Sequence, residues 1–217
     1  MANPFKSRWS GIGVGGSPAL DFVNTLDWRL RKEPLEGLHA YSDLLRWSWS
    51  AGILTGAQAR SLLAWAASHP KPAARELARA IELREAIACL FASVRNEERL
   101  PPASLELLDA FCRAGSADRS LRPAGRFAAW GWSHGDPPPR RPAWAVALDA
   151  TRILTSSERE RLCQCDDLQC GWFFLDTSRN RSRRWCTMKG CGNRNKARSF
   201  YRRSQSGRQK GSRTGCR

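Results

Sequence analysis

Acidic residues are missing from the C-terminal end of this chain. The last 41 residues contain 14 lysines and arginines and not one aspartate or glutamate, whereas residues 1–176 carry 22 basic and 20 acidic residues. Nearly all of the formal net charge of +16 therefore lies in that end segment. A segment of this kind cannot neutralise its own charge, so it predicts a polyanionic partner, with nucleic acid first. A solvated basic tail without a partner is the alternative.

Long apolar runs are also missing. No stretch approaches the roughly 20 apolar residues of a membrane-spanning helix, and the first 20 residues lack the apolar core of a secretory signal. We therefore expect no membrane contact and a cytoplasmic protein, associated with the nucleoid if its partner is DNA. Eight cysteines in such a compartment favour metal ligation over disulfide bonds.

Histidine is scarce, and the motifs of common catalytic sites are absent. His39, His69 and His134 are the only histidines, and none lies in a nucleophile, metalloprotease or phosphate-loop motif. The glycine-rich segment GIGVGG is not closed by Lys-Ser/Thr, so it does not match a nucleotide-binding loop. These absences argue against an enzyme. A deep polar pocket around Asp21 and Asn24 with converging acidic side chains is the feature that would support catalysis instead.

Changes in composition divide the chain into four segments. We expect a flexible lead over residues 1–16, because it is rich in glycine. Residues 17–160 show apolar spacing near a 3.6-residue period, which predicts a helix-rich regulatory domain, with one β-hairpin where bulky residues alternate between 119 and 133. Residues 161–203 form a separate small module. Residues 204–217, rich in Gly, Ser and Arg, predict a disordered basic tail.

A polar cluster interrupts the first apolar stretch of the helix-rich domain. Asp21, Asn24 and Thr25 lie among buried-type residues in the segment LDFVNTLDWR. Short polar side chains in such a place most often bond a neighbouring turn. Contact with a bound ligand is the alternative.

Four cysteines dominate the small module. They are written Cys165-x4-Cys170 and Cys186-x4-Cys191, with fifteen residues between the pairs. Each loop lets two sulfurs converge on one ion, and two loops supply the four ligands of tetrahedral zinc. A module this small has little core of its own, so the metal would be structural. A redox thiol cluster or an iron–sulfur cluster is the alternative, and Cys163 could replace Cys165 as a ligand.

The second cysteine pair runs directly into a basic segment. We expect Asn193 to cap a helix over residues 194–203. Arg194, Arg198 and Arg202 fall at i, i+4 and i+8, on one face of that helix. The predicted nucleic-acid contacts are Arg183, Arg184, Arg194, Lys196, Arg198, Arg202 and Arg203. The arginines suit phosphates or base edges, while an acidic protein or RNA could meet the same face.

The module resembles a known family. The run WFFLDTSRNRSRRWCTMKGCGNRNKARSFYRR contains the tetrapeptide Cys-Gly-Asn-Arg at residues 191–194 and is similar to the CGNR zinc finger family. The segments LDFVNTLDWR and DLLRWSWSAGIL resemble the N-terminal domain that usually precedes this finger in bacterial proteins. The resemblance implies zinc on Cys165, Cys170, Cys186 and Cys191. It also implies a bacterial, stress-linked transcription regulator whose finger binds DNA.

Three hypotheses follow from the sequence. The leading one is a zinc-dependent, DNA-binding transcription regulator whose N-terminal domain senses a small-molecule effector or contacts a partner such as RNA polymerase. An RNA-binding or protein-interaction module with a structural zinc is the second, and an enzyme in the N-terminal domain is the third. The predicted fold class is α+β: a mostly α-helical N-terminal domain with a small β-hairpin, then a zinc module that ends in a basic helix.

Overall fold

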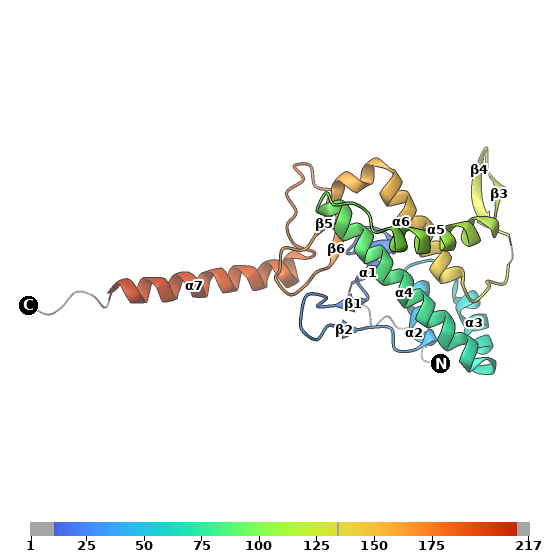
Figure 1. The fold of residues 1–217 in the computed structure, drawn as a ribbon, viewed down its shortest axis with the longest axis horizontal. Coiled ribbons are helices and arrows are strands. Elements are labelled where there is room, and N and C mark those ends of the chain that lie inside the picture. Colours follow the sequence, from blue (N-terminus) through green and yellow to red (C-terminus); the bar gives the residue numbers. More distant parts are fainter. Residues whose placement is uncertain (1–10, 134, 212–217) are drawn as a thin grey trace, which may run out of the picture.

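The computed structural model describes residues 11–133 and 135–211 of the chain. It shows a helical body from which the last helix, α7, projects (Figure 1). The helices of the body are α1 (Pro18–Val23), α2 (Tyr41–Ser50), α3 (Gly56–Ser68), α4 (Pro70–Arg95), α5 (Pro102–Ala117) and α6 (Arg141–Thr155). This arrangement, together with three small antiparallel hairpins, confirms the predicted α+β class. Within the described ranges, no helix combines the length and apolar character needed to cross a membrane.

Helix α4 lies at the centre of the body. The other five helices of the body all pack against it. Its inward side chains include Leu83, Ile87, Leu90 and Phe91, all fully buried. Their spacing of four, three and one residues places them on one face, as the 3.6-residue period of a helix requires. Helix α4 is therefore one of the helices that the apolar spacing of residues 17–160 predicts.

The three hairpins lie at separate places on the body. β1 (Leu26–Asp27) pairs with β2 (Leu35–Glu36), and β3 (Arg119–Ala124) pairs with β4 (Phe127–Trp132). The second of these is the hairpin that the sequence predicted. β5 (Leu162–Gln164) pairs with β6 (Phe173–Leu175), and this pair carries the cysteine module.

Strand β6 belongs to two hydrophobic cores at once. Successive side chains of a strand point to opposite faces. Phe173 accordingly packs into the main helical core, 6.0 Å from the ring of Phe91, while Phe174 packs among the four cysteines. Both side chains are almost completely buried. The cysteine module therefore shares its framework with the N-terminal domain.

Hydrogen bonds to the backbone also hold the N-terminal domain and the cysteine module together. The side chain of Asn24 acts as a neighbouring strand: its Nδ2 donates to the Phe173 carbonyl and its Oδ1 accepts from the Phe173 amide, both at 2.9 Å. The amide of Leu175 donates to the Gly15 carbonyl, and the amide of Arg29 donates to the Cys170 carbonyl. Strand β6 is therefore hydrogen-bonded on both sides.

The lead differs from its prediction as a flexible segment. Residues 1–10 lie outside the described residues, but residues 11–16 are held in place. The carboxylate of Asp21 accepts hydrogen bonds from the amides of Gly13 and Gly15, at 2.6 and 2.8 Å. A carboxylate at the start of a helix, facing backbone amides, fixes a glycine-rich loop that has no side chains to anchor it.

The start and the length of the last helix also differ from prediction. A π-helical turn, η2 (Met188–Gly192), runs directly into α7 (Asn193–Gly211). Asn193 has helical angles (φ −66°, ψ −39°), so its prediction as the N-cap was wrong. Thr187 caps the element instead, because its hydroxyl accepts from the Gly190 amide. Residues 204–211, predicted to be disordered, continue the helix, and residues 212–217 lie outside the described residues.

A buried ion pair fixes the β1–β2 hairpin to α4. The guanidinium of Arg84 is 2% exposed and donates from both terminal nitrogens to Glu36, each at 2.7 Å. Burial acts to raise the pKa of the Glu36 carboxyl, but the bonds from Arg84 and from two backbone amides outweigh it and lower that pKa. Bidentate geometry with further donors is the arrangement in which a buried pair holds its charge.

The lowered pKa of Glu36 predicts a pH-dependent contribution to stability. Its contribution is fully present above the ordinary pKa of 4.5 and is lost as the pH falls through the lower, folded-state value. We expect Glu36→Gln to reduce the free energy of unfolding at neutral pH, and the difference from the wild type to narrow as the pH falls below 4.5. Urea unfolding between pH 3 and 7 measures this; a gap that stays constant with pH would contradict it.

The two faces of β6 predict two different losses. Phe173→Ala should reduce the free energy of unfolding of the helical body by about 3–5 kcal/mol, because it opens a cavity beside Phe91. Phe174→Ala should instead weaken metal retention while the helical body keeps most of its stability. Thermal unfolding followed by circular dichroism, together with zinc release to a chelator, separates the two effects. Equal effects of both variants on both readouts would refute the two-core arrangement.

Candidate metal centre and basic helix

Four buried thiols converge at the end of the body where α7 begins. The sulfur atoms of Cys165, Cys170, Cys186 and Cys191 all lie within 4.8 Å of one another. Two of the separations are 3.7 Å, between Cys170 and Cys186, and 3.4 Å, between Cys186 and Cys191. A tetrahedron of thiolates around zinc has sulfur–sulfur edges of about 3.8 Å, from a zinc–sulfur distance of about 2.3 Å. The spacing fits a four-thiolate zinc ion.

Each cysteine pair lies on a turn that aims its sulfurs inward. Cys165 follows β5, and its amide donates to the Trp172 carbonyl, which closes the first loop. Gly171 adopts a left-handed φ of +72°, and an added Cβ there would lie 2.9 Å from Leu30. The second loop passes through the π-helical turn η2, which places Cys191 beside Cys186. Both loops therefore depend on local backbone features.

Two of the four sulfurs accept hydrogen bonds from outside the cluster of thiols. The amide of Cys186 donates to Cys165 Sγ at 3.4 Å, and Arg194 Nη2 donates to Cys191 Sγ at 2.9 Å. Hydrogen bonds from Cys170 and Cys186 hold the pKa of the Cys165 thiol well below its usual range, while the pKa values of Cys170 and Cys186, which donate to it, and of the buried Cys191 are raised. Binding of zinc would therefore have to displace the protons of these three thiols. Zinc with four thiolates carries a net charge of −2, so an arginine against one ligand offsets part of it. Zinc bound here would hold the two loops together and supply no open coordination position.

Cys163 lies outside the cluster. It stands on β5, opposite Phe174, and is partly exposed. Its side chain shares a face of the hairpin with Phe174 and packs against the cysteine core, but it is not one of the four residues whose ligand atoms converge. The symmetric pairs predicted from the spacing are the ones that the structure brings together.

Asp167 connects the first cysteine loop to α7, and the sequence did not single it out. Its side chain is completely buried, with Oδ2 accepting from Asn195 Nδ2 at 2.9 Å. Arg194 and Arg198 lie 3.5 Å from the same oxygen. Because residues 177–217 contain no acid, basic residues at the start of α7 can find a carboxylate only in an earlier segment. That absence was the signal that could have located Asp167.

The seven predicted nucleic-acid contacts fall into three groups. Arg183 and Arg194 contact the protein itself: Arg183 bonds the carbonyls of Val14 and Cys186, and Arg194, whose side chain is 39% exposed, stacks 4.3 Å over the ring of Trp28. Arg184 and Arg198 are shared between solvent and the acids of the first loop. Lys196, Arg202 and Arg203 are exposed, as is Arg184. The face that the helical periodicity predicted is therefore divided between the interior and solvent.

The predicted polar cluster makes internal hydrogen bonds. Asp21 holds the lead, and Asn24 holds β6, as described above. The hydroxyl of Thr25 donates to the Phe22 carbonyl and accepts from Arg84. Burial, opposed by the two glycine amides, raises the pKa of Asp21. All three side chains therefore hold the protein's own chain, the alternative that the sequence favoured.

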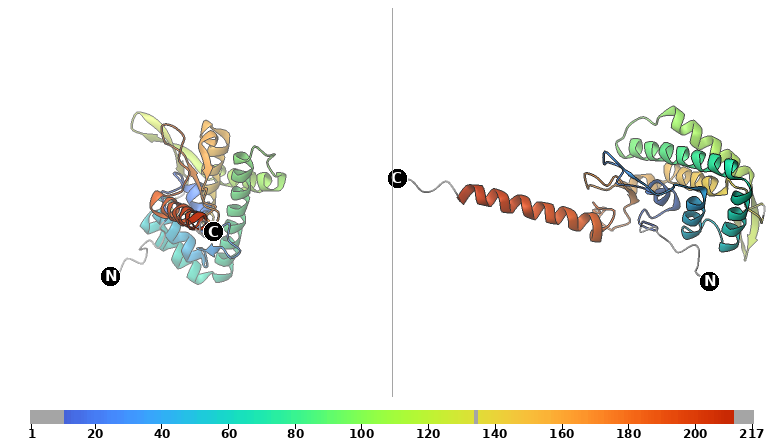
Figure 2. Two further views of the ribbon diagram at one scale, coloured as in Figure 1. Left: turned by 90° about the vertical axis from the view of Figure 1, so that its left-hand side faces the viewer. Right: turned by 90° about the horizontal axis from the view of Figure 1, so that it is seen from below.

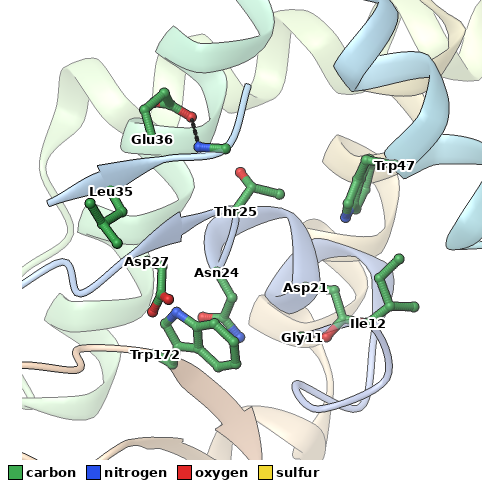
Figure 3. Close-up of a pocket in the computed structure, with 11 residues that line it drawn as sticks. Gly11, Ile12, Asp21, Asn24, Thr25, Asp27, Leu35, Glu36, Trp47 and Trp172 are labelled. Carbon is green, nitrogen blue, oxygen red and sulfur yellow. Dashed lines mark hydrogen bonds between the residues drawn. The ribbon is translucent and has the colours of Figure 1, made fainter. Parts of the chain in front are cut away.

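The same three residues line a cavity between the N-terminal domain and the cysteine module. Its volume is about 180 Å³. Figure 3 shows side chains from both parts around it, with Trp172 of the cysteine module facing Asp27 and Asn24. The other lining residues are Gly11, Ile12, Asp21, Thr25, Leu35, Glu36, Gly37 and Trp47.

Removal of one cluster cysteine should abolish metal binding. We expect one zinc ion per chain, and its loss in Cys191→Ser, with the module unfolding because its small core depends on the metal. Cys163→Ser is the matched control and should retain a full equivalent. Elemental analysis measures the metal content, and tryptophan fluorescence, to which Trp172 and Trp185 contribute, follows the folding of the module. Loss of zinc in the control as well would show that Cys163 is a ligand.

Comparisons with known proteins agree with this geometry. Residues 16–157 match the model of the ABATE family, described as "Putative stress-induced transcription regulator". Residues 161–204 match the model of the CGNR zinc finger. No curated protein matches the chain. Since the first match covers more than half of the chain and the second covers the four-cysteine module, this protein belongs to the ABATE family of regulators and carries a CGNR zinc finger at its C-terminal end.

Proposed function

We propose that this protein is a bacterial, zinc-dependent transcription regulator whose finger binds DNA and whose N-terminal domain senses a ligand or partner. The observation that carries the proposal is the basic helix α7, which begins at the zinc site and stands clear of the body. Figure 2 shows the molecule from two further directions, and in its right-hand view α7 again extends away from the helical body, as in Figure 1. A helix of this shape can approach a duplex without a clash from the domain that carries it.

The charge on α7 supports phosphate contact. Lys196, Arg202 and Arg203 are exposed, and no acid follows Asp176 in the sequence to oppose them. Arg194 supports the same role indirectly, because its bond to the zinc ligand Cys191 holds the first turn of the helix in place. Lysine and arginine contacts to phosphate supply affinity and register, and they carry no base sequence by themselves.

An RNA-binding role is the second candidate, and one observation favours it. Phe200 and Tyr201 are 63% and 66% exposed and lie between the exposed basic residues. Exposed aromatic rings beside arginines are the surface on which unpaired bases stack.

In the leading proposal, the protein acts in the cytoplasm, at the nucleoid. It acts by binding alone and catalyses no reaction. RNA polymerase is a candidate partner for the N-terminal domain.

Charge removal on α7 tests the DNA proposal. We expect Lys196→Ala/Arg202→Ala/Arg203→Ala to weaken duplex binding by roughly tenfold or more and to reduce the slope of log K against log salt by up to about 3. The matched control, Arg60→Ala/Lys71→Ala/Arg75→Ala, removes the same charges from exposed positions on α3 and α4 and should bind as the wild type. Fluorescence anisotropy over a salt series measures both.

The same assay with three nucleic acids separates the candidates. Duplex DNA, structured RNA and single strands are compared at one salt concentration. RNA binding tighter by orders of magnitude, lost in Phe200→Ala/Tyr201→Ala, would replace the DNA proposal. Equal losses in the charge variant and its control would refute a role for α7 with either nucleic acid.

A further inference from the structure

The cavity beneath the zinc finger lies where a regulatory ligand would affect both halves of the protein. Its lining comes from the lead, α1, the β1–β2 hairpin, α2 and the finger residue Trp172 (Figure 3). A volume of about 180 Å³ admits a molecule of about the size of a small metabolite and is below the usual range of drug-sized pockets. Ligand sites commonly occur at such junctions between parts of a chain.

The charged side chains that line the cavity are all acidic. They are Asp21, Asp27 and Glu36, and no lysine, arginine or histidine lines it among the described residues. Two of these carboxylates are already used, Asp21 by the amides of Gly13 and Gly15 and Glu36 by Arg84. Asp27 accepts one hydrogen bond, through Oδ1 from the Trp28 amide at 2.7 Å. Its second oxygen keeps its acceptor capacity, so Asp27 can receive a cation.

Two indole donors face the same space. Trp47 is completely buried, and neither its Nε1 nor that of Trp172 has a hydrogen-bond partner among the described residues. In Figure 3 the nitrogen end of the Trp47 ring points toward the lining side chains, and that of Trp172 is turned toward Asp27. Buried donors are almost always satisfied in folded proteins, so two in one cavity indicate a ligand that brings acceptor oxygens.

We propose that this cavity binds a small hydroxylated primary amine. The protonated amine pairs with Asp27, and hydroxyl or ether oxygens accept from Trp47 Nε1 and Trp172 Nε1. The tryptophan rings add a favourable surface for a cation. An anionic ligand would be repelled by the Asp27 carboxylate, and a purely apolar one would leave the two indole donors unsatisfied.

Binding at this site would be transmitted to the base of α7. Asp27 is followed by Trp28, which has a left-handed φ of 53° and carries Arg194 stacked on its ring. Arg194 in turn bonds the zinc ligand Cys191. Trp172 lies two residues after Cys170 and directly before β6. This inference deepens the ligand-sensing part of the proposed function by naming the ligand class and the residues next to it.

Paired amines and neutral isosteres test the proposal on the full-length, zinc-loaded chain. The probes are serinol against glycerol, which replaces the amine by a hydroxyl, and glucosamine against glucose. Isothermal titration calorimetry at pH 7 should give an affinity at least tenfold higher for one amine than for its isostere. Absence of heat from both amines at millimolar concentration, or equal affinity within both pairs, would overturn the proposal.

Substitutions locate the site. Asp27→Asn keeps an acceptor for the Trp28 amide but removes the charge, and it should lower the affinity for the amine to that of its isostere. Asp109→Asn, at an exposed position on α5, is the matched control and should bind as the wild type. Trp47→Phe, which removes the indole donor, should also weaken binding by several-fold. Unchanged amine binding in both Asp27→Asn and Trp47→Phe would place the ligand elsewhere and overturn the proposal.

No DNA is present in this titration, so the two proposals fail separately. Amine binding that follows Asp27, with no duplex binding by the wild type, would remove the DNA proposal and leave the amine site standing. Duplex binding that depends on α7, with no amine selectivity, would do the reverse.

Discussion

The structure depends on the alternation of one short strand. In β6, Phe173 enters the helical core and Phe174 enters the zinc core, because neighbouring side chains on a strand must face opposite ways. Asn24 holds that strand from the first helix by the two bonds that a paired strand would make. The orientation of the finger relative to the N-terminal domain is thereby fixed by packing on both sides of three residues.

Charge near the zinc ligands determines which arginines remain at the surface. A four-thiolate zinc centre is negative, and buried Asp167 adds another negative charge beside it. The guanidinium of Arg194 lies close to both of these negative groups. Arg183 bonds carbonyls of the lead and of the second cysteine loop. Those two arginines stabilise the start of α7, and the exposed charge begins further along the helix. In the CGNR tetrapeptide of this chain, Arg194 is therefore first a structural residue.

Local patterns predicted what local physics determines. The spacing of the cysteines predicted the metal ligands, because two turns of four intervening residues bring their own sulfurs together, and the 3.6-residue apolar period predicted a helical N-terminal domain. The partners of Asn24 and Arg183 lie 149 and 169 residues away along the chain, so no short pattern could reveal them. The residue type of Asn193 favours an N-cap, whereas the π-helical turn that precedes it places the cap at Thr187. The inward arginines could not be recognised without Asp167, whose burial is a property of the folded chain.

The length of α7 makes it a lever. Its 19 residues span about 28 Å at the rise of an α-helix. Its first turn is held at the zinc site by contacts with Trp28 and Asp167. A tilt of α7 by about 10° at its first turn would move the C-terminal end of the helix by about 5 Å, which is close to one helical pitch. A finger that shares its core with the regulatory domain cannot swing on a linker. Small changes in the packing around the first turn of α7 would therefore produce larger displacements of its C-terminal end.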